Sequence, residues 1–155
     1  MVVAVLLIRH AHAGNRNDWE SDDHLRPLSP KGRRQAAALA RRLRPWKPER
    51  VLSSPFVRCV ETVEPFAESL QRKVEQVDEL GEGAGAAALT LMRSLAGSNV
   101  ALCTHGDITA LVLAALAEED GLDLGRGIRH AKGSTWVLET QGDRFVEATY
   151  RPPPP

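Results

Sequence analysis

Arginine and histidine side chains follow apolar segments of the sequence at the points where those segments end. Arg9 and His10 come directly after the first apolar run, His105 follows a later one, and Arg58 lies shortly after a third. Groups of like charge repel one another in an empty pocket, so such a set is stable when it holds an anion. A planar guanidinium binds two phosphate oxygens at once. The four residues therefore indicate a binding site for a phosphate group.

A histidine among arginines has the properties of a phosphoryl acceptor. Neighbouring positive charge lowers the pKa of a histidine, which keeps the imidazole neutral and nucleophilic near pH 7. The flanking cations stabilise the oxygens of the phosphoryl group during its transfer. Glu79 is the candidate that protonates the leaving group and then activates water, with Glu82 as the alternative acid. Each residue taken alone is commonly structural, and their shared place at strand ends favours the catalytic interpretation.

Alternating strands and helices must position these residues. Apolar, β-branched runs predict strands, and apolar residues spaced three and four apart predict helices. Expected strands cover residues 2–8, 50–52, 74–77 and 99–103, and expected helices cover residues 30–43, 55–70, 86–95 and 108–117. This alternation predicts an α/β fold, a three-layer α/β/α sandwich with a mostly parallel sheet. In such folds ligands bind beyond the carboxyl ends of the strands, where the candidate residues lie.

The C-terminal part departs from that alternation. Residues 135–139 and 144–150 predict an antiparallel hairpin, while the proline-rich residues 151–155 cannot join a sheet. We expect residues 1–150 to form a single domain that is followed by a tail. Ser29 is expected to cap the helix over 30–43, Asp107 to cap the helix over 108–117, and residues 118–129 to form a loop.

Composition narrows the class of protein. The 155 residues include 20 Lys and Arg against 20 Asp and Glu, so the basic surplus of a general nucleic-acid binder is missing. The first apolar run stops at Arg9 without a basic leader, and residues 108–117 are too few to span a bilayer. We therefore expect a cytoplasmic protein that binds neither nucleic acid nor membranes. Cys59 and Cys103 lack metal-ligand spacing and are expected to be small buried hydrophobic residues.

Four motifs, in order along the chain, resemble those of the histidine phosphatase superfamily, the phosphoglycerate-mutase-like group. They are Arg9-His10-Ala11, similar to Arg-His-Gly; residues 28–36, similar to Leu-Thr-x-x-Gly-x-x-Gln-Ala; residues 53–58, similar to Ser-Ser-Pro-x-x-Arg; and the final His105-Gly106. The resemblance implies that His10 is the nucleophile that becomes phosphorylated. It also implies a phosphate pocket formed by Arg9, Arg58, His105 and Gly106 without a metal or other cofactor, and an acid after the third strand, Glu79 or Glu82. The Arg-His-Ala form is similar to the small SixA-type phosphohistidine phosphatases.

The spacing between two candidate residues also bears on the substrate. Only 25 residues separate Glu79 from His105, which is room for one helix and one strand but for no inserted lid. Lids enclose small substrates, so an open pocket is expected, and it suits a phosphoryl group displayed on a protein. We expect phosphohistidine in a protein to be the substrate and the loop over residues 15–25 to set substrate choice.

Three alternatives remain open. An open pocket of the same fold also suits a nucleotide or polyphosphate, a phosphorylated small molecule. A metal-dependent hydrolase would bind its ion with His10, His12, Asp22, His24, His105 and Asp107. The adjacent Arg9 opposes that reading, because a cation disfavours metal binding. Finally, a regulatory module would bind phosphate without turning it over.

Overall fold

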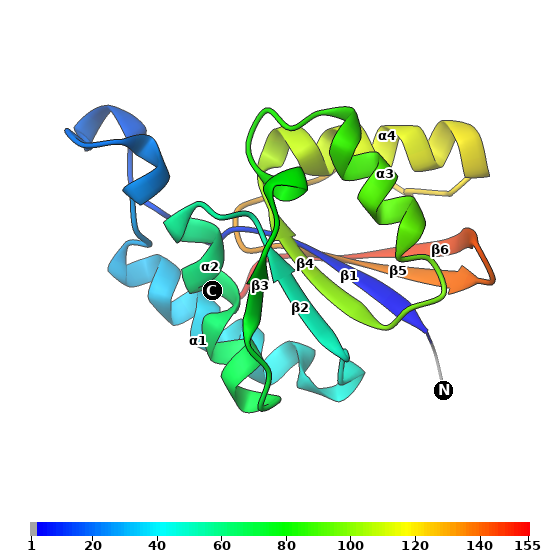
Figure 1. Ribbon diagram of the computed structural model, residues 1–155, viewed down its shortest axis with the longest axis horizontal. Coiled ribbons are helices and arrows are strands. Elements are labelled where there is room, and N and C mark those ends of the chain that lie inside the picture. The colour runs from blue at the N-terminus through cyan, green and yellow to red at the C-terminus, as the bar shows by residue number, and fades with distance from the viewer. Residues whose placement is uncertain (1–2) are drawn as a thin grey trace.

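A six-stranded sheet in the order β3-β2-β4-β1-β5-β6 forms the centre of the molecule in a computed structural model, which describes residues 3–155 (Figure 1). The strands are β1 (Ala4–Arg9), β2 (Arg50–Ser53), β3 (Val74–Gln76), β4 (Val100–Thr104), β5 (Thr135–Gln141) and β6 (Arg144–Arg151). The first four strands run parallel to one another, whereas β5 runs antiparallel to β1 and to β6. The mostly parallel sheet and the C-terminal hairpin are thereby confirmed. The expected start of the first strand at Val2 lies outside the described residues.

Four helices connect the strands, together with short 3-10 turns. The helices are α1 (Pro30–Leu43), α2 (Val57–Ser69), α3 (Ala86–Ser94) and α4 (Gly106–Asp120), and the turns are η1 (Arg16–Asp18), η2 (Asp23–Leu25), η3 (Arg44–Trp46) and η4 (Asp78–Leu80). Ser29 caps α1 as predicted, because its side chain accepts a hydrogen bond from the amide of Gly32. No helix within residues 3–155 combines the length and the apolar character needed to cross a membrane.

Helix α4 is longer than the sequence pattern predicts. It begins at Gly106 with His105 at the N-cap, so Asp107 lies in the first turn and is not the cap. An acidic residue in the first turn is favourable there because it faces the positive end of the helix dipole. The helix continues through Asp120 and ends at Gly121, whose left-handed conformation stops it, so the expected loop begins three residues later than predicted.

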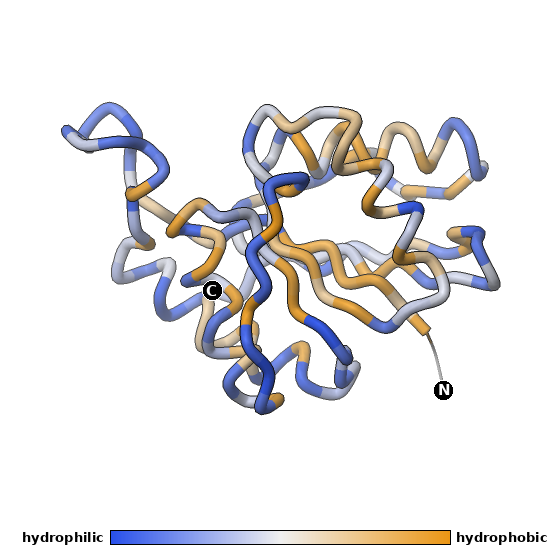
Figure 2. The backbone as a smooth tube through the Cα atoms, in the orientation of Figure 1, coloured by the Kyte–Doolittle hydropathy of each residue, from blue (hydrophilic) through white to orange (hydrophobic). Residues whose placement is uncertain are grey.

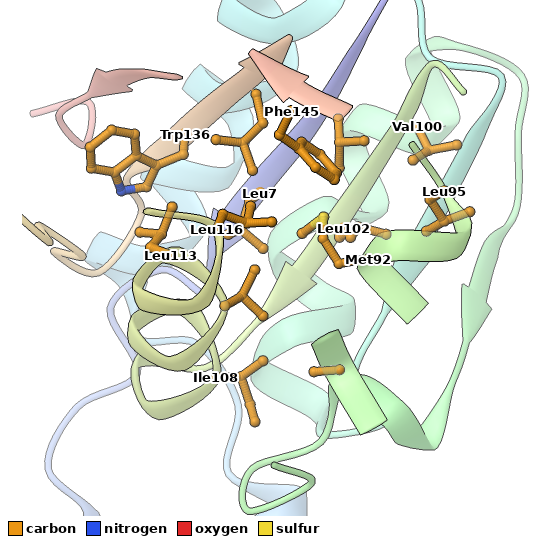
Figure 3. Close-up of a cluster of buried hydrophobic side chains, with 14 of the residues drawn as sticks. Leu7, Met92, Leu95, Val100, Leu102, Ile108, Leu113, Leu116, Trp136 and Phe145 are labelled. Atoms are coloured by element: carbon orange, nitrogen blue, oxygen red, sulfur yellow. The ribbon is translucent and has the colours of Figure 1, made fainter. Parts of the chain in front are cut away.

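Two hydrophobic clusters hold the layers together, because successive side chains of a strand point to opposite faces. From β1, Leu6 and Ile8 pack with the cluster that contains α1 and α2, and Leu7 packs with the cluster that contains α3 and α4. The central strands β1 and β4 are apolar along most of their length in Figure 2. Figure 3 shows the cluster that contains α3 and α4, with Leu113 and Trp136 among its members. The predicted three-layer α/β/α sandwich is confirmed.

The C-terminal residues lie against α1. Arg151 pairs with Thr135 and is the last residue of β6, so the expected tail begins one residue later. The carbonyl of Pro152 accepts a hydrogen bond from Arg42, and that of buried Pro154 accepts one from Gln35.

Candidate active site

The carboxyl ends of the neighbouring strands β1 and β4 bring His10 and His105 together. Arg9 is opposite Thr104 in the sheet, and the amide of His10 donates to the carbonyl of Thr104 over 3.0 Å. The rings of His10 and His105 meet edge to face with their centroids 5.5 Å apart. The strand order therefore assembles residues that are almost a hundred positions apart in the sequence.

His10 is held as a neutral imidazole with one defined tautomer. Its Nδ1 lies 2.8 Å from the carbonyl oxygen of Ala11, and since a carbonyl only accepts, Nδ1 carries the hydrogen and Nε2 keeps a free lone pair. Burial lowers the pKa of His10 to about 3, and the charges of His105, Arg58 and Arg9 act in the same direction. The amide of Ala11 donates to Thr62 of α2, which fixes the carbonyl that orients the ring. His10 thus presents an unprotonated Nε2 at neutral pH.

His105 has one nitrogen bonded inside the protein and one without a partner. Its Nε2 lies 2.8 Å from the hydroxyl of Ser54, and that hydroxyl accepts from the amide of Phe56, so its hydrogen is available to Nε2. In the tautomer in which Nε2 accepts from Ser54, Nδ1 carries the hydrogen, and Nδ1 is buried without a hydrogen-bond partner among residues 3–155. A buried donor without a partner is costly, and a phosphate oxygen is an acceptor that satisfies it. Cys59, 3.5 Å from Nε2, is free and buried, as is Cys103, which agrees with the prediction for both.

Arg9 packs against the first residue of α4. A Cβ atom on Gly106 would lie 2.8 Å from Cζ of Arg9, so only glycine permits this approach. One Nη of Arg9 donates to the carbonyl of His130 over 2.7 Å and lies 3.2 Å from its Nδ1. Burial lowers the pKa of Arg9, against the attraction of Asp107. The guanidinium and the N-terminus of α4 together place positive charge beside His10.

Arg58 lies beneath the site and is covered by two carboxylates. Its guanidinium donates to the carbonyl and the carboxylate of Asp23, at 2.8 and 3.1 Å, and to the carboxylate of Glu82 at 3.1 Å. The residue is completely buried and does not line the cavity described below. The carboxylates occupy only the two Nη groups, and Nε of Arg58 is buried without a hydrogen-bond partner among residues 3–155. The phosphate-binding role of Arg58 stays a prediction.

The two acidic candidates after β3 differ in where they point. Leu80 is buried, and its carbonyl accepts from Thr104, so the turn η4 is anchored through that residue. Glu79 is exposed and does not line the cavity, whereas Glu82 lines it and bonds to Arg16 over 2.8 Å as well as to Arg58. The geometry favours Glu82 over Glu79 as the acid of this site.

A cavity of about 710 Å³ opens over these groups. Its lining comprises Arg9, His10, His12, Gly14, Asn15, Arg16, Arg26, Glu82, His105, Gly106, Asp107, His130 and Lys132. The segment between Glu79 and His105 contains only the end of η4, a loop, α3 and β4, so within these described residues nothing is inserted that closes over the cavity.

The sequence patterns do not indicate several of the residues that line the cavity, above all His130 and Lys132. They precede β5, whose first residue, Thr135, pairs with Ile8 near the end of β1. The antiparallel pairing of β5 with β1 therefore carries the preceding segment to the site. The motifs contain no signal for this segment, and only the pairing of the hairpin with the first strand would have found it.

The predicted rim loop 15–25 borders the site, and it does not form a metal centre. Its residue Asp23 contacts Arg58 and Arg26, and His24 stacks on Phe56 with ring centroids 4.0 Å apart. Within residues 3–155 no three His, Cys, Asp or Glu side chains are grouped so that they could hold a metal ion. The ligand set of the metal-dependent alternative is not assembled.

Comparison with known proteins agrees with this geometry. Residues 5–88 match the histidine phosphatase superfamily (branch 1). The chain belongs to this family. It is 33% identical to an 8-oxo-(d)GTP phosphatase of Mycolicibacterium smegmatis over 97% of its own length and 48% of the relative's, so the chain spans about half the length of that curated relative.

Solved structures of other proteins share the fold of this chain over nearly its whole length. A proposed phosphohistidine phosphatase SixA of Nakamurella multipartitia superposes with a TM-score of 0.78 and 25% identity, covering 99% of this chain and 97% of that one. The protein histidine phosphatase SixA complexed with tungstate superposes with a TM-score of 0.75 at 20% identity, covering 97% and 96% of the two chains. The second likeness bears on the fold alone.

Proposed function

We propose that the chain is a metal-independent phosphatase that forms a phosphohistidine on His10. The observation that carries the proposal is the bond from Nδ1 of His10 to the Ala11 carbonyl, which leaves a neutral Nε2 facing a cationic cavity. In the first step Nε2 forms a bond to phosphorus as the bond to the leaving group breaks. In the second, water attacks the phosphohistidine, gives its proton to a carboxylate, and releases phosphate from a regenerated His10.

Arg9, His105 and the N-terminus of α4 would hold the phosphoryl oxygens in both steps. Arg9 supplies a guanidinium, and Nδ1 of His105 supplies the buried donor that has no protein partner within residues 3–155. Glu82 is the proposed proton carrier because it lines the cavity, and Glu79 is the alternative. A phosphoryl group that takes over Arg58 would also release Glu82 from its ion pair.

Trapping the intermediate tests the mechanism. The protein is exposed briefly to a ³²P-labelled phosphosubstrate such as acetyl phosphate, quenched without acid, and analysed by mass spectrometry. Label on His10 that is lost in acid supports the proposal, because phosphoramidates are acid-labile. Turnover without label on His10 would refute it, and phosphate binding without turnover would identify a non-catalytic module.

For the substrate, phosphohistidine in a protein is one candidate. No segment between Glu79 and His105 closes over the cavity, so a phosphoryl group on a protein surface has access to it. The likeness to the proposed phosphohistidine phosphatase SixA of Nakamurella multipartitia adds support for this candidate.

A nucleotide is the second candidate, and one feature of the cavity favours it. Three further cations, Arg16, Arg26 and Lys132, line the cavity beyond Arg9. The curated relative that bears the name 8-oxo-(d)GTP phosphatase adds support. Rates measured side by side with a phosphohistidine protein and with nucleoside di- and triphosphates distinguish the two candidates.

A further inference from the structure

Lys132 is a cation of the cavity that no carboxylate neutralises. Within residues 3–155 it has no ion pair and makes no hydrogen bond, although it is only half exposed and lines the cavity with His10. Burial lowers the pKa of Lys132, and the charges that act on it, from Arg9, Arg26, Arg58 and Arg16, are all positive and lower it further. Holding a lysine among arginines is unfavourable unless an anion binds between them.

The backbone around Lys132 is fixed to the catalytic strand. The amide of Gly133 donates to the carbonyls of Arg9 and His10, at 3.2 and 3.0 Å, and the amide of Arg9 donates to Ser134. Gly133 is buried and has a positive φ of 84°, which allows the chain to turn there. Lys132 is therefore held next to the reacting histidine by backbone bonds and does not belong to a free loop.

Arg26 provides a second cation on the same cavity. Its side chain is buried, with Nε bonded to Asp23 over 3.0 Å and one Nη bonded to the carbonyl of Ala13 over 2.6 Å. Its other Nη makes no hydrogen bond within residues 3–155. His12 lines the cavity together with Arg26 and Lys132. Its pKa is lowered by burial and also by the positive charge of Lys132.

We propose that Lys132 and Arg26 form a second anion subsite, so that the preferred substrate carries two consecutive phosphate groups, as a nucleoside diphosphate or triphosphate does. The inference rests on the proposed reaction at His10. The terminal phosphoryl group lies against Arg9, His10 and His105, and the next phosphate lies against Lys132 and Arg26. A lone phosphoryl group on a protein histidine leaves Lys132 without a partner.

This placement also accounts for the leaving group. As Nε2 of His10 bonds to the terminal phosphorus, the bond from that phosphorus to the bridging oxygen breaks, and the shortened nucleotide keeps the electron pair as a phosphate oxyanion. Lys132 and Arg26 stabilise that charge, so the leaving group needs no proton from Glu82, which is engaged with Arg16 and Arg58. Water then releases orthophosphate from His10 and gives its proton to Glu82.

Lys132→Gln tests the subsite, with Lys73→Gln as the matched control on an exposed lysine of a different surface depression. The rates for ADP and for p-nitrophenyl phosphate are compared in each protein. We expect Lys132→Gln to lower kcat/KM for ADP about ten- to hundred-fold more than for p-nitrophenyl phosphate, since charge-assisted bonds have this magnitude. Lys132→Arg should restore part of the difference, and Lys73→Gln should leave the ratio of the two rates as it is.

The subsite would be overturned if Lys132→Gln lost kcat/KM equally for ADP and for p-nitrophenyl phosphate, or if a phosphohistidine protein were turned over faster than ADP. In either case, label on His10 would leave the proposed function standing. Absence of that label with every substrate would instead refute the proposed function. Binding gives a readout that needs no turnover. Calorimetry should show that pyrophosphate binds the protein more tightly than orthophosphate and that Lys132→Gln abolishes the difference; equal affinities in the unaltered protein would refute the subsite.

Discussion

The two halves of the cavity are built from different kinds of bonds. The inner half, around His10 and His105, is held by backbone groups at strand ends and by buried neutral partners such as Ser54. The outer half, around Arg16, Arg26 and Lys132, includes ion pairs between side chains, such as those from Arg16 and Arg26 to Asp23. Exposed ion pairs are weak and screened by salt, whereas buried backbone bonds are not. The inner half is thus suited to holding the reacting groups in a fixed geometry, and the outer half is suited to selecting among substrates.

The strongest test of this contrast removes the inner nucleophile. His10→Ala should lower kcat at least about 1,000-fold, because covalent catalysis depends on one nitrogen, and it should abolish labelling by the phosphosubstrate. Orthophosphate should still bind, since Arg9 and the outer cations remain. Calorimetry with orthophosphate serves as the control for folding. Normal turnover by His10→Ala would show that the inner half is not the reaction centre.

Gly106→Ala disturbs the inner half without removing a catalytic group. The added Cβ would lie 2.8 Å from Cζ of Arg9, so the guanidinium has to shift from its present position. Displacement of a positioning group by about 1 Å costs on the order of a hundred-fold in rate, and we expect a loss of about ten- to hundred-fold in kcat/KM. Steady-state kinetics and the free energy of unfolding are measured together. A variant with unchanged kcat/KM would show that Arg9 does not depend on this close approach.

Acid should destabilise the inner half through His10. Burial lowers the pKa of His10 from its ordinary value near 6.5 to about 3. Between these values the unfolded chain binds a proton that the folded protein does not, so stability falls as the pH is lowered through this range. One proton corresponds to a loss of about 1.4 kcal/mol per pH unit in the free energy of unfolding. The free energy of unfolding is measured by denaturant titration at several pH values between about 3 and 6.5. Plotted against pH, it should fall more steeply in the unaltered protein than in His10→Gln by this amount, and parallel plots would refute the buried neutral state.

Sequence patterns predict the inner half far better than the outer half. Alternating strands and helices predict a mostly parallel sheet, which places His10 and His105 at the same edge. That β1 and β4 are neighbours, which brings the two rings together, comes from the structure. Lys132 reaches the site through the non-local pairing of β5 with β1, which no local pattern near Lys132 indicates. The sequence places Glu79 first, because it follows the third strand more closely. Leu80 is buried in the short turn, and it is Glu82 and not Glu79 that lines the cavity, which the sequence pattern does not indicate.

The carboxylate of Asp23, which bonds to Arg58, offers the sharpest test of the outer half, and its removal has the smallest expected effect. Burial acts to raise the pKa of Asp23, but its bond with Arg26 and the charges of Arg58 and Arg16 outweigh this and lower it, so Asp23 competes with a phosphate as an anion. Asp23→Asn keeps an oxygen for hydrogen bonding and removes the charge. We expect inorganic phosphate to inhibit this variant a few-fold more strongly, in line with a gain of about 0.5–1 kcal/mol from a partly exposed ion pair.

Asp22→Asn is the matched control, because Asp22 lies in the same loop and bonds to His24 without contacting an arginine within residues 3–155. Its inhibition constant for phosphate should remain that of the unaltered protein. The gain in Asp23→Asn should also shrink as salt is added, since the competing attraction is electrostatic and partly exposed. Weaker inhibition of Asp23→Asn would mean that Asp23 orients Arg58 toward the ligand, and the outer half would then take part in holding the reacting phosphoryl group itself.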